Sequence, residues 1–196
     1  MTQHLNNMKI GDTLDFVGPK GRLIYQRNGT FLIRPLKLSD PPSNVSGKFF
    51  FRFRLVYLKS LQFETLGIKN IGMIAGGSGI TPMLQIVRDV FKSQEDTKIK
   101  LLFANQTEKD ILLREEIEDI QRQYPTRFSF MYTLDRPGED WKYEKGFINQ
   151  SMIESHMPLP SDDTMVLICG PPPMVKFACM PNLEKAGHKE SRIFVY

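Results

Sequence analysis

A glycine-rich turn with the sequence AGGSGITP occupies residues 75–82, between an apolar run at 71–75 and a helical pattern that follows. The run predicts a buried strand, and Thr81 and Pro82 predict the N-cap and the first residue of the helix. Glycines let a backbone approach a pyrophosphate closely, and a helix N-terminus offers free N–H groups and a positive dipole end. The turn lacks the third glycine of the usual dinucleotide fingerprint and the Gly-Lys-Ser/Thr of a Walker loop. It therefore indicates an unusual phosphate-binding loop, with a tight structural turn as the alternative.

A second unusual turn, CGPPPM, occupies residues 169–174 after another apolar run. Its prolines fix a rigid backbone, and Cys169 would place a thiol at the rim of the predicted sheet. If the strand before the glycine-rich turn is central, the two turns flank the topological switch point, where α/β sheets bind ligands. Cys169 taken alone would more often be a small buried hydrophobe, and Cys179 on the following helix is predicted to be core. Two unusual turns at one crevice indicate a binding site more strongly than either turn alone.

Strand and helix patterns alternate from residue 71 to the C-terminus. Predicted strands cover 71–75, 99–104, 128–134, 165–169 and 192–196, and predicted helices begin near 83, 113 and 174. The second helix is striped by Leu113, Ile117, Ile120 and Tyr124 and ends at Pro125. Such alternation is typical of right-handed βαβ units. The sequence therefore predicts an α/β fold whose five-stranded parallel sheet has the order 3-2-1-4-5, with helices on both faces.

The residues before 70 have a different organisation. Short predicted strands at 13–17, 22–25 and 30–34 look like the partial end of a β-barrel domain whose beginning precedes Met1. The following segment crowds aromatic residues and arginines in GKFFFRFRLVYLKSLQFE. An additional hairpin or a poorly folded insertion is the favoured interpretation, and a basic membrane-surface segment is the alternative. The expected domains are 1–38 as the partial barrel, 39–69 as an atypical linker or insertion, and 70–196.

Composition limits the classes of function. The 196 residues carry a net charge of +4, which is too small and scattered to indicate a nucleic-acid partner. Two cysteines make no disulfide framework and fit a reducing compartment, and the three histidines share no ligand spacing, so no metal site is expected. No apolar run reaches the length of a membrane span, and the first residues lack the apolar stretch of a signal peptide. A cytoplasmic protein is therefore expected.

The two turns and their surroundings resemble the NADH domain of the NADH–cytochrome b5 reductase family, within the ferredoxin–NADP reductase superfamily. Over about residues 70–196 the resemblance rests, in order and spacing, on GMIAGGSGITPM, LLFANQTEKDILLR, YTLDR, GFI, CGPPPM, ACMPNL and an aromatic C-terminal strand. IGDTLDFVGPKG is similar to the last strands of the family's flavin-binding barrel, and the opening MTQ is similar to the end of its flavin-pyrophosphate motif. The resemblance implies an N-terminally truncated form.

The resemblance also implies a role for each matching residue. Gly76, Gly77, Ser78 and Gly79 would line the phosphates and nicotinamide of NADH, and Pro82 and Gly170 would also contact the cofactors. Thr81 at the flavin ring and Cys169 at the nicotinamide C4 edge would be the catalytic residues. Asn105, Thr133 and Phe147 would touch the adenosine half, while Asp135 would bind the adenine ribose and repel a 2′-phosphate. Pro171 and Met174 would complete the cleft, and Met1 and Thr2 would contact FAD.

The activity implied by the resemblance is that of a flavin-dependent oxidoreductase. NADH would pass a hydride to FAD, and the reduced flavin would deliver single electrons to cytochrome b5 or a similar haem protein. The full-length form would be cytoplasmic and could associate with the cytosolic face of membranes. This chain lacks the family's Arg-x-Tyr-Thr/Ser flavin-anchoring motif and has residues 39–69 in place of a short link. The alternative is therefore a truncated nucleotide-binding fragment without catalytic activity. The sequence does not indicate which oligomeric state the protein adopts.

Overall fold

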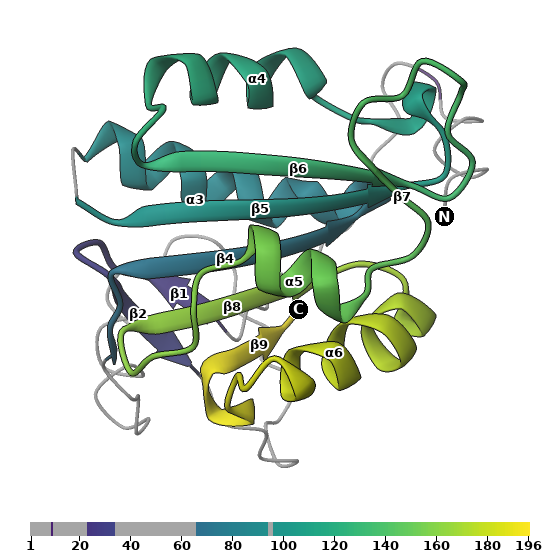
Figure 1. Ribbon diagram of the computed structural model, residues 1–196. Coiled ribbons are helices and arrows are strands. Elements are labelled where there is room, and N and C mark those ends of the chain that lie inside the picture. The colour runs from purple at the N-terminus through teal and green to yellow at the C-terminus, as the bar shows by residue number, and fades with distance from the viewer. Residues whose placement is uncertain (1–8, 10–22, 34–65, 94–95) are drawn as a thin grey trace.

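A six-stranded parallel sheet forms the centre of the computed structural model, which describes residues 9, 23–33, 66–93 and 96–196 (Figure 1). Its strands are β4 Asn70–Gly76, β5 Lys98–Asn105, β6 Phe128–Leu134, β7 Glu144–Lys145, β8 Thr164–Cys169 and β9 Ile193–Val195, in the order β7-β6-β5-β4-β8-β9. The predicted α/β fold with a parallel sheet is confirmed. The predicted count of five strands is wrong, because β7 adds a sixth strand beyond β6. A strand of two residues has no periodicity, so no sequence pattern indicated β7.

Helices cover both faces of the sheet (Figure 1). One face packs against α3 Ile80–Lys92 and α4 Arg114–Gln123. The other face packs against α5 Gln150–His156, the π-helical turn η3 Met174–Cys179 and α6 Met180–Lys185. The sequence did not predict α5, which has only seven residues and is capped by the side chain of Asn149, whose oxygen accepts from the N–H of Met152 at 3.0 Å. A helix of about two turns is too brief for its apolar spacing to be recognised.

The strands are largely apolar because both faces of the sheet are covered, although β5 carries Lys98 and Lys100 and β6 carries Ser129. In β4, Ile71, Met73 and Ala75 point to the core beneath α3, whereas Ile74 points to the core beneath α5 and α6. In β5, Leu101 and Leu102 divide in the same way between the two cores. Cys179 is fully buried in the second core, as predicted.

The apolar stripe predicted for the second helix, α4, was wrong at one position. Leu113 is not part of the buried face: it is 47% exposed, lies at the N-cap of α4, and has a left-handed backbone with φ of 55°. Ile117 is fully buried, and Ile120 and Tyr124 pack against the core from the sides. The helical stripe therefore begins one turn later than its sequence period suggests.

A small antiparallel sheet precedes the parallel one. It contains β1 Leu23–Tyr25, β2 Thr30–Ile33 and β3 Leu66–Gly67, in that order. Phe31 in β2 is fully buried in the same core as α3 and β4, so this sheet is packed against the larger domain. The predicted strand at 13–17 lies outside the described residues, as does 39–65 of the segment for which a hairpin, an insertion or a membrane-surface role was considered. In the described ranges, no helix has the length and apolar character needed to cross a membrane.

Truncation of Phe31 tests the contact between the two sheets. We expect Phe31→Ala to lower the free energy of unfolding by about 3–5 kcal/mol, because it leaves a cavity in the shared core. The matched control is Phe177→Ala, at a ring that is 70% exposed, which should change the free energy by no more than about 0.5 kcal/mol. Urea unfolding followed by circular dichroism measures both. Equal midpoints for the Phe31 variant and the parent protein would contradict the shared core.

Candidate functional site

The glycine-rich turn and the proline-rich turn meet at the carboxyl edge of the sheet. They follow β4 and β8, which are parallel neighbours with Ala75 paired to Cys169. A Cβ atom added to Gly79 would lie 2.0 Å from the carbonyl oxygen of Cys169. The backbones of the two turns are therefore in direct contact, and only glycine fits at this position. The structure thus brings the two turns to one edge, as the sequence predicted.

The same close packing continues around Gly76 and Gly170. A Cβ on Gly76 would lie 2.7 Å from Sδ of Met174 and 2.9 Å from Cδ of Pro171. A Cβ on Gly170 would lie 2.4 Å from Cε of Met174 and 3.2 Å from Cα of Gly76. Met174 therefore fills the space between the turns, while Pro171 and the two prolines after it remain exposed. The π-helical turn η3 begins at Met174, and such turns occur often at functional sites.

The helix after the glycine-rich turn begins earlier than predicted. Residues 77–79 form the single 3-10 turn η1, and α3 begins at Ile80 with Gly79 as its N-cap. Thr81 and Pro82 are consequently the second and third helical residues, and the prediction of a Thr81 N-cap was wrong. The Thr81 hydroxyl instead donates to the carbonyl oxygen of Ser78 at 3.0 Å. Ser78 and Thr81 are exposed at the carboxyl edge, where the first turn of α3 begins.

Cys169 lies half-buried at the end of β8, and burial raises the pKa of its thiol. The thiol is therefore neutral at neutral pH and is a poor nucleophile. Next to it lies Tyr196, whose N–H donates to the carbonyl oxygen of Ile168 at 3.0 Å. Burial, and to a smaller extent Cys169, raises the pKa of the Tyr196 hydroxyl to about 12. The sequence showed an aromatic last strand but did not indicate that its final residue would reach Cys169.

Asn105 is the most unusual polar residue of this edge. It ends β5, beside the last residues of β4, and only 7% of it is exposed. Neither its Nδ2 nor its Oδ1 has a hydrogen-bond partner among the described residues. A buried amide without partners costs about 1–3 kcal/mol, so such a group is rare unless a ligand completes it. The Asn105 amide is therefore a buried polar group whose hydrogen-bonding capacity is not used within the described residues.

Two further predicted residues lie next to Asn105, at the end of β6. The N–H of Asp135 donates to the carbonyl oxygen of Asn105 at 3.1 Å, and the Asp135 side chain is exposed. The hydroxyl of Thr133 is buried and donates to the carbonyl oxygen of Gly146 at 2.6 Å, which leaves it engaged within the protein. Phe147 follows Gly146 and is 76% exposed. Met1 and Thr2, the remaining predicted contacts, lie outside the described residues.

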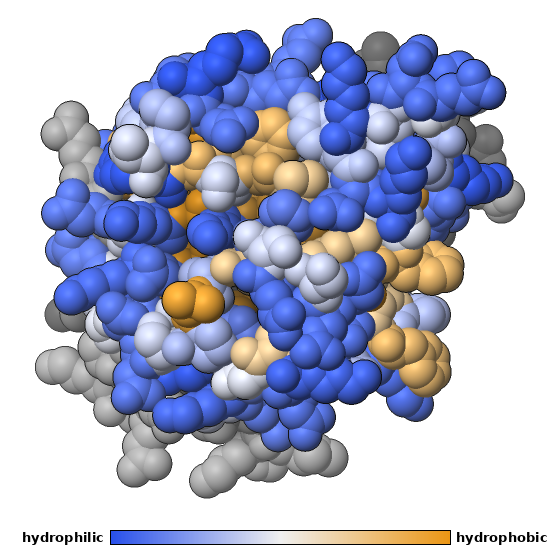
Figure 2. Space-filling view, viewed as in Figure 1, coloured by the Kyte–Doolittle hydropathy of each residue, from blue (hydrophilic) through white to orange (hydrophobic). Residues whose placement is uncertain are grey.

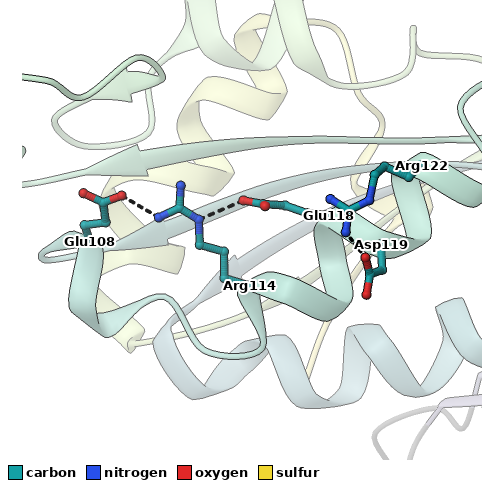
Figure 3. A network of polar contacts seen from close by, with 5 residues as sticks. All are labelled: Glu108, Arg114, Glu118, Asp119 and Arg122. Carbon is teal, nitrogen blue, oxygen red and sulfur yellow. Dashed lines mark hydrogen bonds and ion pairs between the residues drawn. The ribbon is translucent and has the colours of Figure 1, made fainter.

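Ion pairs hold the loop that follows Asn105. Arg114, at the start of α4, pairs with Glu108 in that loop and with Glu118 one helical turn further on, at 2.8 Å (Figure 3). Within the loop, Thr107 donates to the carboxylate of Asp110 from its hydroxyl and its N–H, which lowers the pKa of that carboxyl. The Glu108–Arg114 pair thereby ties the loop to α4, and this positions the chain leaving Asn105.

Hydrophobic side chains are exposed at several places on the surface. Figure 2 shows a mostly hydrophilic face with hydrophobic side chains at several positions, including the right-hand margin, toward which β5 and β6 point in Figure 1. Phe147 and Phe177, both exposed, belong to segments that follow β7 and β8. An exposed apolar rim around a polar edge is typical of a site that binds a large, partly aromatic ligand.

The fold is that of a doubly wound α/β domain, a class that binds its ligands at the carboxyl ends of the strands. Residues 73–180 match the oxidoreductase NAD-binding domain, and the chain belongs to that family. It is 49% identical over its whole length to NADH-cytochrome b5 reductase 2 of Gallus gallus and 48% identical to NADH-cytochrome b5 reductase 1 of Homo sapiens. The resemblance predicted from the motifs is thus confirmed. The chain spans 58% and 57% of the lengths of these two relatives.

A solved structure of a cytochrome b5 reductase domain is also similar to this chain. The cytochrome b5 reductase domain of Ulva prolifera nitrate reductase is 36% identical and superposes with a TM-score of 0.80. The match covers 100% of this chain and 64% of that one. The superposed fold is therefore that of a reductase domain of this type.

Substitution of Gly79 tests the contact between the turns. We expect Gly79→Ala to lower the free energy of unfolding by about 1–3 kcal/mol, because the added methyl group must push the Cys169 carbonyl aside. Gly138→Ala is the matched control: its added Cβ meets nothing within 4 Å, and its effect should stay within about 0.5 kcal/mol. Thermal and urea unfolding of the two variants measure the difference. Similar stabilities for both would show that the turns can separate at no cost.

Proposed function

We propose that this chain binds NADH along the carboxyl edge of β4, β5, β6 and β8 and acts in an oxidoreductase of the NADH–cytochrome b5 reductase type. NADH is the hydride donor, FAD the acceptor, and cytochrome b5 or a similar haem protein receives single electrons from the flavin. The observation that carries the proposal is the buried, unpartnered side chain of Asn105 beside two turns in backbone contact. The similarity to reductases of this name over the whole chain supports it.

The glycine-rich turn would hold the pyrophosphate and the nicotinamide of NADH. Gly76, Gly77, Ser78 and Gly79 carry little or no side chain, so the ligand can approach the backbone and the start of α3. Pro82, Gly170, Pro171 and Met174 close the neighbouring side of the cleft. The bound nicotinamide and flavin supply the redox chemistry, and the protein aligns their rings and excludes water.

Two residues would touch the reacting rings. The neutral Cys169 thiol would lie against the nicotinamide C4 edge, where it adds bulk without adding charge. Thr81 would contact the flavin ring through its hydroxyl while keeping its hydrogen bond to Ser78. Met1 and Thr2 would extend the flavin site toward the pyrophosphate of FAD.

The adenosine half of NADH would bind at the ends of β5 and β6. Asn105 would gain partners for both of its side-chain atoms, and Phe147 offers an exposed ring for the adenine. Thr133 would act by holding Gly146 and thereby the backbone before Phe147. The exposed Asp135 would accept from the ribose hydroxyls and repel a 2′-phosphate.

In this proposal, different parts of the chain bind the two cofactors. Residues 70–196 would form the NADH domain, residues 1–38 would belong to the flavin domain, and residues 39–69 would connect them. The enzyme would work in the cytoplasm, at the cytosolic face of membranes in its full-length form.

Replacement of Asn105 by an apolar side chain of similar size is the sharpest test of the binding site. We expect Asn105→Leu to raise the free energy of unfolding by about 1–2 kcal/mol without nucleotide, because it removes an unpaired buried amide. The same change should weaken NADH binding by about tenfold or more. Urea unfolding and isothermal calorimetry give the two values.

Asn182→Leu is the matched control, since the Asn182 amide donates to the carbonyl oxygen of Ala178 at 2.8 Å. It should lower stability and leave NADH affinity unchanged. If Asn105→Leu stabilises the protein but binds NADH as tightly as the parent protein, Asn105 is not part of the nucleotide site.

The choice of nucleotide is predicted to depend on Asp135. In the FAD-supplemented protein, Asp135→Ala should shift the ratio of kcat/KM for NADH over NADPH by about tenfold or more toward NADPH, because a like-charge contact is removed. Reduction of ferricyanide measures the ratio, and Asp140→Ala, at an exposed carboxylate in the same loop, should not change it. An unchanged ratio rejects the role of Asp135, whereas no turnover with any variant rejects the oxidoreductase.

A further inference from the structure

Apart from the proposed NADH site, the structure has a polar cavity between the segments that lead into β8 and β9. Its volume is about 230 Å³, and its lining residues are Pro160, Ser161, Asp162, Thr164, Gly187, His188, Lys189 and Arg192. Because β8 and β9 are parallel neighbours, both segments arrive at the amino ends of the strands, opposite the turns that follow β4 and β8 (Figure 1). We call this space the entry cavity. It is separate from the proposed NADH site.

His188 and Thr164 are the two buried residues among those that line the entry cavity. Only 7% of His188 is exposed. Burial lowers the pKa of the imidazole, so the free protein holds this ring neutral at neutral pH. A neutral imidazole presents one hydrogen-bond donor and one acceptor. His188 can therefore form a hydrogen bond with a group that occupies the cavity.

Two cationic side chains line the same space. Arg192 is half-buried and forms no ion pair with any carboxylate in the described ranges. Lys189 pairs with Asp162 at 3.1 Å, with both side chains largely exposed, so this pair is easily rearranged. With His188 neutral, Lys189, Arg192 and Asp162 give the lining a net charge of +1. A protonated His188 raises that charge to +2, and an anion is the natural counterpart.

The size of the entry cavity limits the ligand. Cavities that hold drug-sized or larger ligands have volumes of roughly 300–1,000 Å³, and this one falls below that range. A dinucleotide does not fit, but a single tetrahedral oxyanion with its waters does. Guanidinium and imidazolium groups are well suited to such an ion, because they donate directed, charge-assisted hydrogen bonds.

We propose that the entry cavity binds a small tetrahedral oxyanion, either inorganic phosphate or the phosphate group of a small molecule. Arg192 and Lys189 bind the anion oxygens, and His188 donates a hydrogen bond from the floor of the cavity. Occupancy joins the segment before β8 to the segment before β9 and stabilises that end of the sheet.

Binding of the anion and protonation of His188 are coupled. A bound anion favours the imidazolium over the neutral ring, so it raises the pKa of His188 from its lowered value. By linkage, a dianion of constant charge binds more tightly as the pH falls through the pKa of His188. The other charged groups facing the cavity are Asp162, Lys189 and Arg192.

The test follows the His188 ring by NMR in the complete chain. Sulfate is the probe, because its two negative charges persist over this pH range, and sodium chloride keeps the ionic strength constant. We expect a saturable shift of the His188 signals and a raised His188 pKa at saturating sulfate. The signals are distinguished from those of the other two histidines by comparison with His4→Gln and His156→Gln variants.

Two variants and two ligands complete the experiment. Arg192→Gln should weaken sulfate binding by about tenfold or more, whereas Arg122→Gln, at an exposed arginine of α4, should leave it unchanged. Titration with inorganic phosphate and with glycerol phosphate distinguishes a free ion from a phosphorylated small molecule.

The wild-type titration decides the proposal even if a variant fails to fold. A His188 signal that does not move saturably with sulfate, inorganic phosphate or glycerol phosphate overturns it. Equal affinity in Arg192→Gln and the parent protein overturns it as well, because the half-buried cation would then have no part in binding.

Discussion

The backbone contact between Gly79 and the carbonyl of Cys169 is the constraint on which the rest of the candidate site depends. A side chain at Gly79 would force apart the ends of β4 and β8, since its Cβ would lie 2.0 Å from that carbonyl oxygen. The contact lets α3 start directly at the sheet edge and sets Cys169 beside that start. Met174 then fills the remaining space between the two turns. A single absent side chain thus determines how closely the ends of β4 and β8 approach each other.

The parts of the fold that the sequence predicted share one physical origin. Strands β4, β5, β6 and β8 are mostly buried, so their residues form short, largely apolar runs that alternate with helical patterns, as in a parallel α/β sheet. The parts that it missed are short. β7 is held in place by the chain around it, including the Trp141 ring N–H that donates to the carbonyl oxygen of Glu144 at 2.8 Å. Such elements exist through tertiary contacts and leave no period in the sequence.

The candidate site was predictable to a similar degree. The two turns could be recognised from glycine and proline alone, but their contact distances depend on the register of β4 with β8. The sequence showed an asparagine at the end of β5, yet not that both atoms of its amide would be buried without partners. The entry cavity could not be predicted at all, because His188 and Thr164 come together only when β9 pairs with β8.

The lengths of the two edge strands affect how far the sheet can pair with a strand of another chain. The parallel sheet ends in β7, with two residues, on one side and in β9, with three residues, on the other. The long strands β4 and β5 lie between neighbours, so their backbone hydrogen bonds are used within the sheet. Such short edge strands offer little backbone to a strand from another molecule, but β7 pairs only with Thr133 and Leu134, so among the described residues 128–132 of β6 form the longer open edge of the sheet.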